Sequence, residues 1–257
     1  MSTWVLLRGL TRESGHWGPF PQILGARLPG ARVMTLDLPG CGRFHDVRSP
    51  ARIEAATEAC RQQLKALGAE PPYHLLALSL GAMVAVDWAA RHPGELAGCV
   101  LVNTSLRPFS AWHERLRPVN YGSLLGLLLT RDARRREETI LRLTSRHLRP
   151  GDPVVDEWTA IRAARPVSRS NALRQLSAAV RYRAAVRAPT VPLLVLASTQ
   201  DALVNVRCSR RLARQWNADL VEHPSAGHDL ALDDGVWLAV QVGRWVAQVQ
   251  PPPSAAW

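Results

Sequence analysis

The chain has 257 residues, of which 47% are hydrophobic, so it is long and apolar enough for one large α/β domain or two small ones. Its formal net charge is +11, and Lys65 is its only lysine, so arginine carries nearly all of the positive charge. We interpret this charge as a solvated surface, with an acidic partner or an anionic substrate as the alternative. No recognition motif or basic–aromatic array indicates a nucleic-acid-binding protein.

Two further features narrow the class of protein. No apolar run approaches the roughly 20 residues of a membrane span, and no basic region followed by a signal-peptide core opens the chain. We therefore expect a cytoplasmic protein. The four cysteines match neither a metal-binding spacing nor a compact disulfide framework, and the apolar periodicity around Cys60 and Cys99 predicts buried thiols.

The first part of the chain alternates between strand and helix patterns. Apolar runs predict strands at residues 4–7, 32–38, 73–78 and 96–102, with helices between them at 17–28, 51–67 and 80–90. This alternation favours an α/β fold with a mostly parallel central sheet, helices on both faces and right-handed crossovers.

From about residue 106 to residue 189 the strand patterns disappear. Helices are predicted at residues 120–129, 134–147, 154–164 and 171–187. They fit either a helical excursion of the core domain or a lid over a functional site, because both need the same helices.

The strand and helix patterns then return, with strands at residues 191–197 and 220–223 and helices at 208–216 and 235–249. We therefore divide the chain into a first core part, a helical cap, a second core part and a loose, proline-rich tail. These segments are residues 1–106, 107–189, 190–250 and 251–257.

Ser79 lies between a predicted strand and a predicted helix, in the string Ala77-Leu78-Ser79-Leu80-Gly81. A sharp strand-to-helix turn exposes a nucleophilic serine, and the crowded backbone around it needs small neighbours two residues before and after. The turn also aims the backbone N–H of Leu80 at the reacting oxygen. The string by itself also fits an ordinary turn, and it is the flanking strand and helix that favour a nucleophile.

A serine nucleophile needs a general base, and the base needs an orienting carboxylate. His228 and Asp201 each follow a predicted strand, and functional groups gather beyond the carboxyl ends of parallel strands. Asp201 is preferred because it follows a buried strand directly, whereas the carboxylate of Asp229, next to His228, would point elsewhere. The other competing aspartates are Asp219 and Asp233. The alternative for His228 is a structural histidine.

A second oxyanion donor is expected in the loop after the first strand, where Gly9 permits a tight turn. Leu10 is the candidate, and the alternative is an ordinary strand-ending turn.

Together these motifs resemble the α/β-hydrolase superfamily, whose members carry Ser, Asp and His in this order along the chain. The resemblance is closest to its small single-domain carboxylesterases, among them the pimeloyl-acyl-carrier-protein methyl ester esterases. It is carried by Leu6-Leu7-Arg8-Gly9-Leu10, Asp37-Leu38-Pro39-Gly40-Cys41-Gly42, Leu78-Ser79-Leu80-Gly81, Thr199-Gln200-Asp201 and Ala226-Gly227-His228-Asp229.

The resemblance implies an eight-stranded sheet with a helical cap between strands six and seven. It also implies a Ser79–Asp201–His228 triad, with Leu10 and Leu80 as oxyanion donors. Two positions depart from the family pattern: Ala77 replaces the first glycine of the elbow, and Arg8 replaces a histidine. Arg8 has two interpretations, a ligand for a substrate carboxylate or an ion-pair partner of Glu13, and we favour the second.

The motifs predict a serine hydrolase that cleaves a small-molecule carboxylic ester through an acyl-enzyme, with no metal and no organic cofactor. The same triad serves carbon–carbon bond hydrolysis, lactone opening, perhydrolysis and pyruvate elimination in relatives, so these reactions stay open. A catalytically silent binding protein with this fold is the alternative of a different class.

The predicted cap carries the features that bear on substrate and partner. Its apolar residues fit either an acyl pocket or helix packing; they are Leu106, Trp112, Leu124, Leu125, Leu128 and Trp158. Its arginines suggest an acidic acyl-carrier protein as a further partner, although charge runs are more often solvated. These arginines are Arg134, Arg135, Arg136, Arg142 and Arg146.

Overall fold

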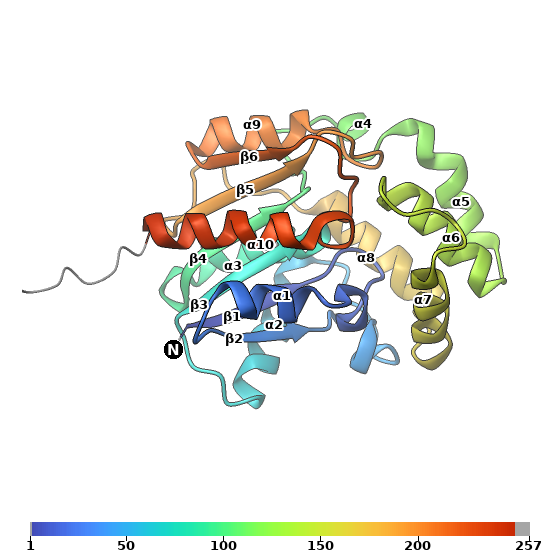
Figure 1. Ribbon diagram of the computed structural model, residues 1–257, viewed down its shortest axis with the longest axis horizontal. Coiled ribbons are helices and arrows are strands. Elements are labelled where there is room, and N and C mark those ends of the chain that lie inside the picture. The colour runs from blue at the N-terminus through green and yellow to red at the C-terminus, as the bar shows by residue number, and fades with distance from the viewer. Residues whose placement is uncertain (1, 250–257) are drawn as a thin grey trace, which may run out of the picture.

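A sheet of six parallel strands organises the protein, and the computed structural model describes residues 2–249 (Figure 1). The strands are β1 (Thr3–Leu7), β2 (Arg32–Leu36), β3 (Tyr73–Leu78), β4 (Leu96–Val102), β5 (Leu193–Ser198) and β6 (Asp219–His223). They lie in the order β2-β1-β3-β4-β5-β6, and every neighbouring pair is parallel. The predicted mostly parallel α/β sheet is confirmed. The described residues form six strands, however, where the resemblance implied eight.

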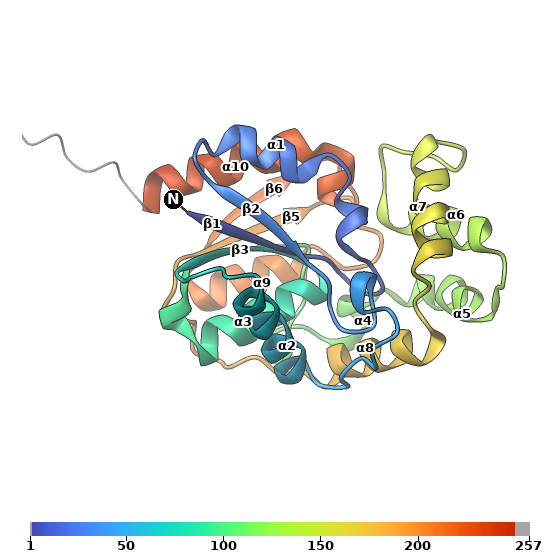
Figure 2. The ribbon, with the colours of Figure 1, turned by 90° about the horizontal axis from the view of Figure 1, so that it is seen from below.

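Helices cover both faces of the sheet. Figure 2 shows α1 (Phe20–Arg27) and α10 (Leu230–Val249) on one face, and α2 (Ile53–Ala66), α3 (Leu80–Arg91) and α9 (Arg207–Trp216) on the other. Side chains alternate along β1, so that Trp4 and Leu6 pack under the first pair while Val5 and Leu7 pack under the other three. Because both faces are buried, the strands are continuous apolar runs.

A helical segment lies between β4 and β5, beyond the carboxyl ends of the strands (Figures 1 and 2). It contains α4 (Trp112–Arg115), α5 (Tyr121–Leu129), α6 (Ala133–Thr144), α7 (Pro153–Ala164) and α8 (Arg169–Arg181). In this six-stranded sheet the segment follows the fourth strand, and not the sixth. It has a small core of its own around Leu141, Val155 and Trp158.

Most predicted elements match the structure within a few residues, and the exceptions have local causes. The helix predicted at residues 171–187 ends at Arg181, because the chain after it turns to pair Arg183 with Arg107. The last helix begins at Leu230, five residues earlier than predicted, and is kinked at Asp234. Four short 3-10 helices complete the elements: Ser14–Trp17, Gly42–Phe44, Pro93–Glu95 and Pro118–Asn120.

All four cysteines are free and buried, which confirms the prediction for Cys60 and Cys99. Within residues 2–249, no helix is both long and apolar enough to cross a membrane. Residue 250 and the tail predicted at 251–257 lie outside the described residues.

Candidate active site

Ser79 occupies a tight turn between β3 and α3. Its backbone has φ 56° and ψ −112°, a conformation that is unfavourable for any residue with a side chain and that clusters at functional sites. A Cβ atom on Gly81 would lie 2.5 Å from the carbonyl oxygen of Leu7, and one on Gly9 would lie 3.3 Å from the Cβ of Ser79. The backbone around Gly81 therefore leaves no room for a side chain, and the space beside Gly9 is tight.

Asp201 and His228 lie together although 27 positions separate them in the chain. The Nδ1 atom of His228 is 2.7 Å from Oδ2 of Asp201, and both side chains are buried. The other oxygen of Asp201 accepts hydrogen bonds from the backbone N–H groups of Leu203 (2.7 Å) and Val204 (2.9 Å). The carboxylate is therefore held in place and orients the imidazole.

Asn103 and Thr104, which directly follow β4, hold the serine turn and the histidine loop at the same edge of the sheet. Asn103 donates from Nδ2 to the carbonyl oxygen of His228 (2.8 Å) and accepts from the N–H of Ser198 (2.7 Å). Thr104 donates from its hydroxyl to the carbonyl oxygen of Ser79 (3.1 Å). Neither residue belongs to a motif that the sequence predicted. Their place at the carboxyl end of a buried strand was the available signal.

The hydroxyl of Ser79 forms no hydrogen bond with His228 within the described part of the chain. Such bonds are often long in a free enzyme and tighten when substrate binds. The surroundings of His228 favour the protonated imidazole. Burial by itself would lower the pKa of His228, but the charge and the hydrogen bond of Asp201 oppose it, and the balance raises this pKa above its usual value.

Arg8 pairs with Asp229, and not with Glu13 as we expected. Its two terminal nitrogens lie 3.0 Å and 2.5 Å from the carboxylate oxygens, and both side chains are buried. The guanidinium also stacks on Trp17 at 4.7 Å. Although burial opposes ionisation, Arg8 holds the pKa of Asp229 below its usual range. The guanidinium thus neutralises the buried carboxylate of Asp229 in the loop that carries His228.

Glu13, the expected partner of Arg8, is instead bound by Arg165 just after α7. A second buried charge cluster lies beside this pair. Oε2 of Glu137 on α6 lies 2.6 Å from Nη1 of Arg12, and the same carboxylate also pairs with Arg162. These ion pairs join the loop after β1 to the helical segment. Burial disfavours the charge of Glu137, but the two arginines hold its pKa below the usual value.

The proposed oxyanion donors lie on the two turns that meet at Ser79. Leu80 is the first residue of α3, where free backbone N–H groups and the helix dipole favour negative charge. Leu10 lies in the turn after β1 and is half-buried. The next residue, Thr11, has φ 58° and donates its N–H to Oε1 of Gln175 on α8 (2.9 Å). The helical segment thereby holds the turn.

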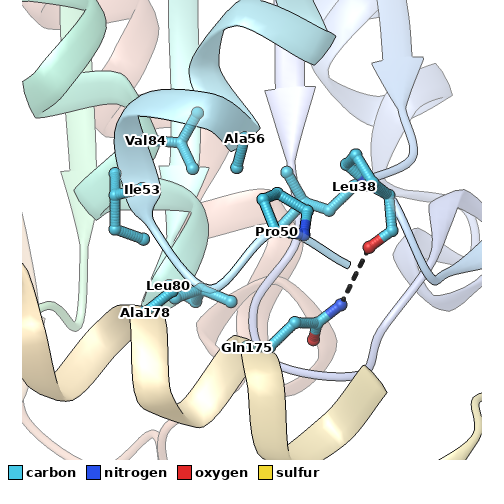
Figure 3. A pocket seen from close by; sticks show the side chains of 9 residues that line it. Leu38, Pro50, Ile53, Ala56, Leu80, Val84, Gln175 and Ala178 are labelled. Carbon is cyan, nitrogen blue, oxygen red and sulfur yellow. Dashed lines mark hydrogen bonds between the residues drawn. The ribbon is translucent and has the colours of Figure 1, made fainter. Parts of the chain in front are cut away.

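A small, mostly apolar pocket adjoins Leu80 (Figure 3). It lies between the loop after β2, helices α2 and α3, and helix α8. Its lining residues are Leu38, Pro39, Pro50, Ile53, Ala56, Leu80, Val84, Gln175 and Ala178.

The apolar residues predicted to line an acyl pocket do not line this pocket. Trp112 is exposed beside Tyr121, and Leu124 and Leu128 are half-buried on α5. The pocket residues come from four separate segments, so no single sequence pattern reveals them.

The chain belongs to the alpha/beta hydrolase family, whose family model matches residues 4–241. It is 29% identical over 258 residues to a protein of Variovorax paradoxus (strain S110) named "Putative carbamate hydrolase RutD", covering 96% of this chain and 92% of the relative. Among solved structures it resembles a thermophilic esterase from Thermogutta terrifontis, with a TM-score of 0.73, 20% identity and coverage of 97% and 90% of the two chains.

It also resembles the enol-lactonase from Burkholderia xenovorans LB400, with a TM-score of 0.75, 19% identity and coverage of 96% and 91%. At these identities the solved structures support the fold alone. The protein is thus an α/β hydrolase, and its family and fold agree with the resemblance carried by its motifs.

Proposed function

We propose that this protein is a serine hydrolase that cleaves carboxylic esters, with Ser79 as nucleophile, His228 as general base and Asp201 as the orienting carboxylate. The main support is the buried pair of His228 and Asp201 at 2.7 Å, beside a serine held in a strained turn. A histidine with only a structural role would not need a carboxylate held by backbone hydrogen bonds, or a strained serine at the same sheet edge. The combination therefore favours a catalytic role.

In this mechanism Nε2 of His228 takes the proton of the Ser79 hydroxyl while the serine oxygen attacks the ester carbonyl. The N–H groups of Leu80 and Leu10 stabilise the negative oxygen of the tetrahedral intermediate. His228 then gives the proton to the alcohol as the ester C–O bond breaks. The acyl group stays bound to Ser79 as an acyl-enzyme. Water, deprotonated by His228, attacks this acyl group, and the acid departs as Ser79 regains its proton.

The helical segment, residues 107–189, acts as a cap over this site. Three contacts support this role, because each joins the segment to a loop of the proposed machinery. Gln175 binds the N–H of Thr11, Glu137 binds Arg12, and the N–H of Asp229 donates to the carbonyl oxygen of Thr144 (2.8 Å). A displaced cap would therefore disturb both the oxyanion loop and the histidine loop.

A carbamate is the second candidate substrate, because the relative from Variovorax paradoxus carries that name at 29% identity over 96% of this chain. The same serine would attack a carbamate carbonyl, and the oxyanion donors would serve it equally. Lactone opening uses the same steps with the alcohol retained on the acyl group. Comparison of an ester, a lactone and a carbamate of matched acyl size separates these reactions.

An ester bound to an acidic carrier protein finds less support. Of the α6 arginines suggested for that partner, Arg134 pairs with Asp156 and Arg135 pairs with Asp132. A carrier-bound ester would show turnover that falls steeply with salt while a neutral ester does not. Equal salt dependence for both substrates excludes a carrier protein as the main partner.

The decisive experiment measures hydrolysis of p-nitrophenyl acetate, butyrate, octanoate and palmitate by the wild-type protein and by Ser79→Ala, with fluorophosphonate labelling of both. We expect turnover and labelling in the wild type and neither in the variant. The chain-length profile will show how large an acyl group the site accepts. Thr104→Val, which keeps the Ser79 hydroxyl, serves as the matched control and should still be labelled.

Labelling of Ser79 without ester turnover would support Ser79 as the nucleophile. It would indicate that the substrate is a carbamate, a lactone or a carrier-bound ester. A folded wild-type protein that shows neither turnover nor labelling would favour the catalytically silent binding protein.

A further inference from the structure

Exposed apolar side chains gather on one part of the helical segment. Of the twelve large hydrophobic residues that are exposed among the described residues, eight lie on α4, α5, α8 and the turn between α4 and α5. They are Trp112, Val119, Tyr121, Leu125, Leu129, Leu173, Leu176 and Val180. Helix α5 has the sequence YGSLLGLLL and contains no buried residue. A helix that is apolar on all sides is normally buried, so this one lacks a partner.

Hydrogen bonds from arginines tie these helices together at both ends. Arg169, at the start of α8, donates to the carbonyl oxygen of Leu129 at the end of α5 (3.2 Å). Arg115 on α4 donates to the carbonyl oxygen of Ala179 near the end of α8 (2.7 Å). Figures 1 and 2 show both helices in the segment beyond the carboxyl ends of the strands, with α5 at the end of the molecule. We call these helices and the eight apolar residues the α5–α8 face.

The charges around the α5–α8 face are mostly positive, although the exposed Asp132 directly follows Arg131. Six exposed arginines lie in or next to its segments, and none of them forms an ion pair among residues 2–249: Arg107, Arg117, Arg131, Arg169, Arg181 and Arg183. In residues 107–131 and 169–187 the only acidic residue is Glu114, and Arg211 neutralises it. Exposed arginines elsewhere on the described surface include paired ones, such as Arg210 with Glu222, and unpaired ones, such as Arg32. The α5–α8 face differs from them in joining its arginines to exposed apolar side chains.

We infer that the α5–α8 face docks onto an anionic lipid surface. Exposed leucine and aromatic side chains enter the headgroup boundary, and unpaired arginines bind anionic headgroups. An acidic protein would satisfy the arginines but would leave eight large apolar side chains without a matching environment. A lipid surface provides both.

Docking would bring the lipid surface next to the proposed active site. Arg117 donates from Nη1 to the carbonyl oxygen of Asp201 (3.1 Å), and Asn120 donates to that of Ala202 (2.6 Å). The turn between α4 and α5 therefore contacts the loop that carries the proposed triad carboxylate. The docking itself is independent of the catalytic proposal, and it can be measured with the Ser79→Ala protein.

The test is flotation of the full-length protein with vesicles of phosphatidylcholine alone or with added phosphatidylglycerol, at low and high salt. We expect binding only to the anionic vesicles and weaker binding at high salt. The double substitution Leu125→Ser and Leu129→Ser should weaken binding roughly tenfold or more, because two leucines no longer enter the boundary. Arg117→Gln with Arg131→Gln should weaken it by a similar factor.

Matched controls lie elsewhere on the protein. Val236 on α10 is 62% exposed, compared with 66% for Leu129, and Arg32 on β2 is also exposed. Val236→Ser and Arg32→Gln should bind as the wild type does, and circular dichroism should show every variant folded.

The inference is overturned if the wild-type protein fails to bind anionic vesicles, or if the leucine variant binds as tightly as the Val236→Ser control. Loss of binding in the arginine variant alone would reduce the effect to general charge attraction and would also overturn it. Self-association that the leucine substitutions abolish, without vesicle binding, would assign the face to a second copy of the chain. None of these outcomes depends on whether the protein hydrolyses esters.

Discussion

Gln175 on α8 accepts a hydrogen bond from the backbone N–H of Thr11, across 164 positions of the chain. Its amide nitrogen donates to Sγ of Cys41 (3.1 Å), so one buried side chain joins the loop after β1 to the loop after β2. Thr11 directly follows the proposed oxyanion donor Leu10. We therefore propose that Gln175 is a positioning residue, through which the helical segment helps to shape the turn that carries Leu10.

We expect Gln175→Leu to lower kcat by roughly 10- to 100-fold with a smaller effect on KM, because the oxyanion donor is displaced by a fraction of an ångström. The partly buried N–H of Thr11 loses its partner, which costs about 1 kcal/mol of stability. Arg174→Gln is the control, since Arg174 anchors α8 only to the carbonyl oxygen of Ser49 in the loop after β2. Steady-state kinetics and thermal unfolding of both variants test this role. Equal loss of kcat in the two variants would contradict it.

The buried pair of Arg8 and Asp229 should stabilise the protein only when both partners are present. Arg8→Met leaves an uncompensated buried carboxylate, and we expect a loss of about 3–5 kcal/mol. The double variant Arg8→Met with Asp229→Leu should recover most of that loss. Urea unfolding of the two single variants and the double variant gives the coupling energy, and additive losses would argue against a coupled pair.

The same pair predicts a loss of stability in acid. The pKa of Asp229 is lower in the folded protein than in the unfolded chain, where it is about 3.9. Its contribution is therefore complete above the unfolded pKa and is lost as the pH falls through the folded pKa. Unfolding free energies of the wild type and Asp229→Asn across the acid range should differ most above that unfolded value.

The pH dependence of kcat/KM should report the ionisation of His228. The base acts only when neutral, and the structure raises its pKa above the usual value of about 6.5. Activity should therefore rise with pH through a midpoint above that value and then level off. Asp201→Asn removes the charge that raises this pKa, so the midpoint should move to lower pH while kcat falls by up to about 10⁴-fold. An unchanged midpoint would show that another group controls the profile.

Gly81 is the glycine of the elbow that should least tolerate a side chain. An added Cβ would lie 2.5 Å from the carbonyl oxygen of Leu7 and 2.7 Å from that of Arg8, and both are backbone atoms of a buried strand end. Gly81→Ala should cost about 1–3 kcal/mol and lower kcat, because the turn that carries Leu10 must move. Gly126→Ala on α5 meets no atom within 4 Å and should stabilise the helix by about 0.5–1 kcal/mol. Thermal unfolding that ranks the two variants in the opposite order would refute this account.

The sequence by itself determined the elements that build the sheet and brought three candidate residues to one edge of it. Residues 73–78 and 96–102 were predicted with the observed bounds, because apolar runs ended by turn residues encode buried parallel strands locally. A parallel sheet places the carboxyl ends of its strands together, so the order of Ser79, Asp201 and His228 along the chain was enough to predict that they share an edge.

Only the tertiary structure decided which charged groups pair and where a pocket forms. Arg8 lies five residues from Glu13 but pairs with Asp229, 221 positions away, because the packing of α10 against α1 brings the loop of His228 over the end of β1. Asn103 and Gln175 likewise act on residues far along the chain. Local patterns encode burial and turns, whereas the partner of a buried polar group depends on which segments the completed fold brings together.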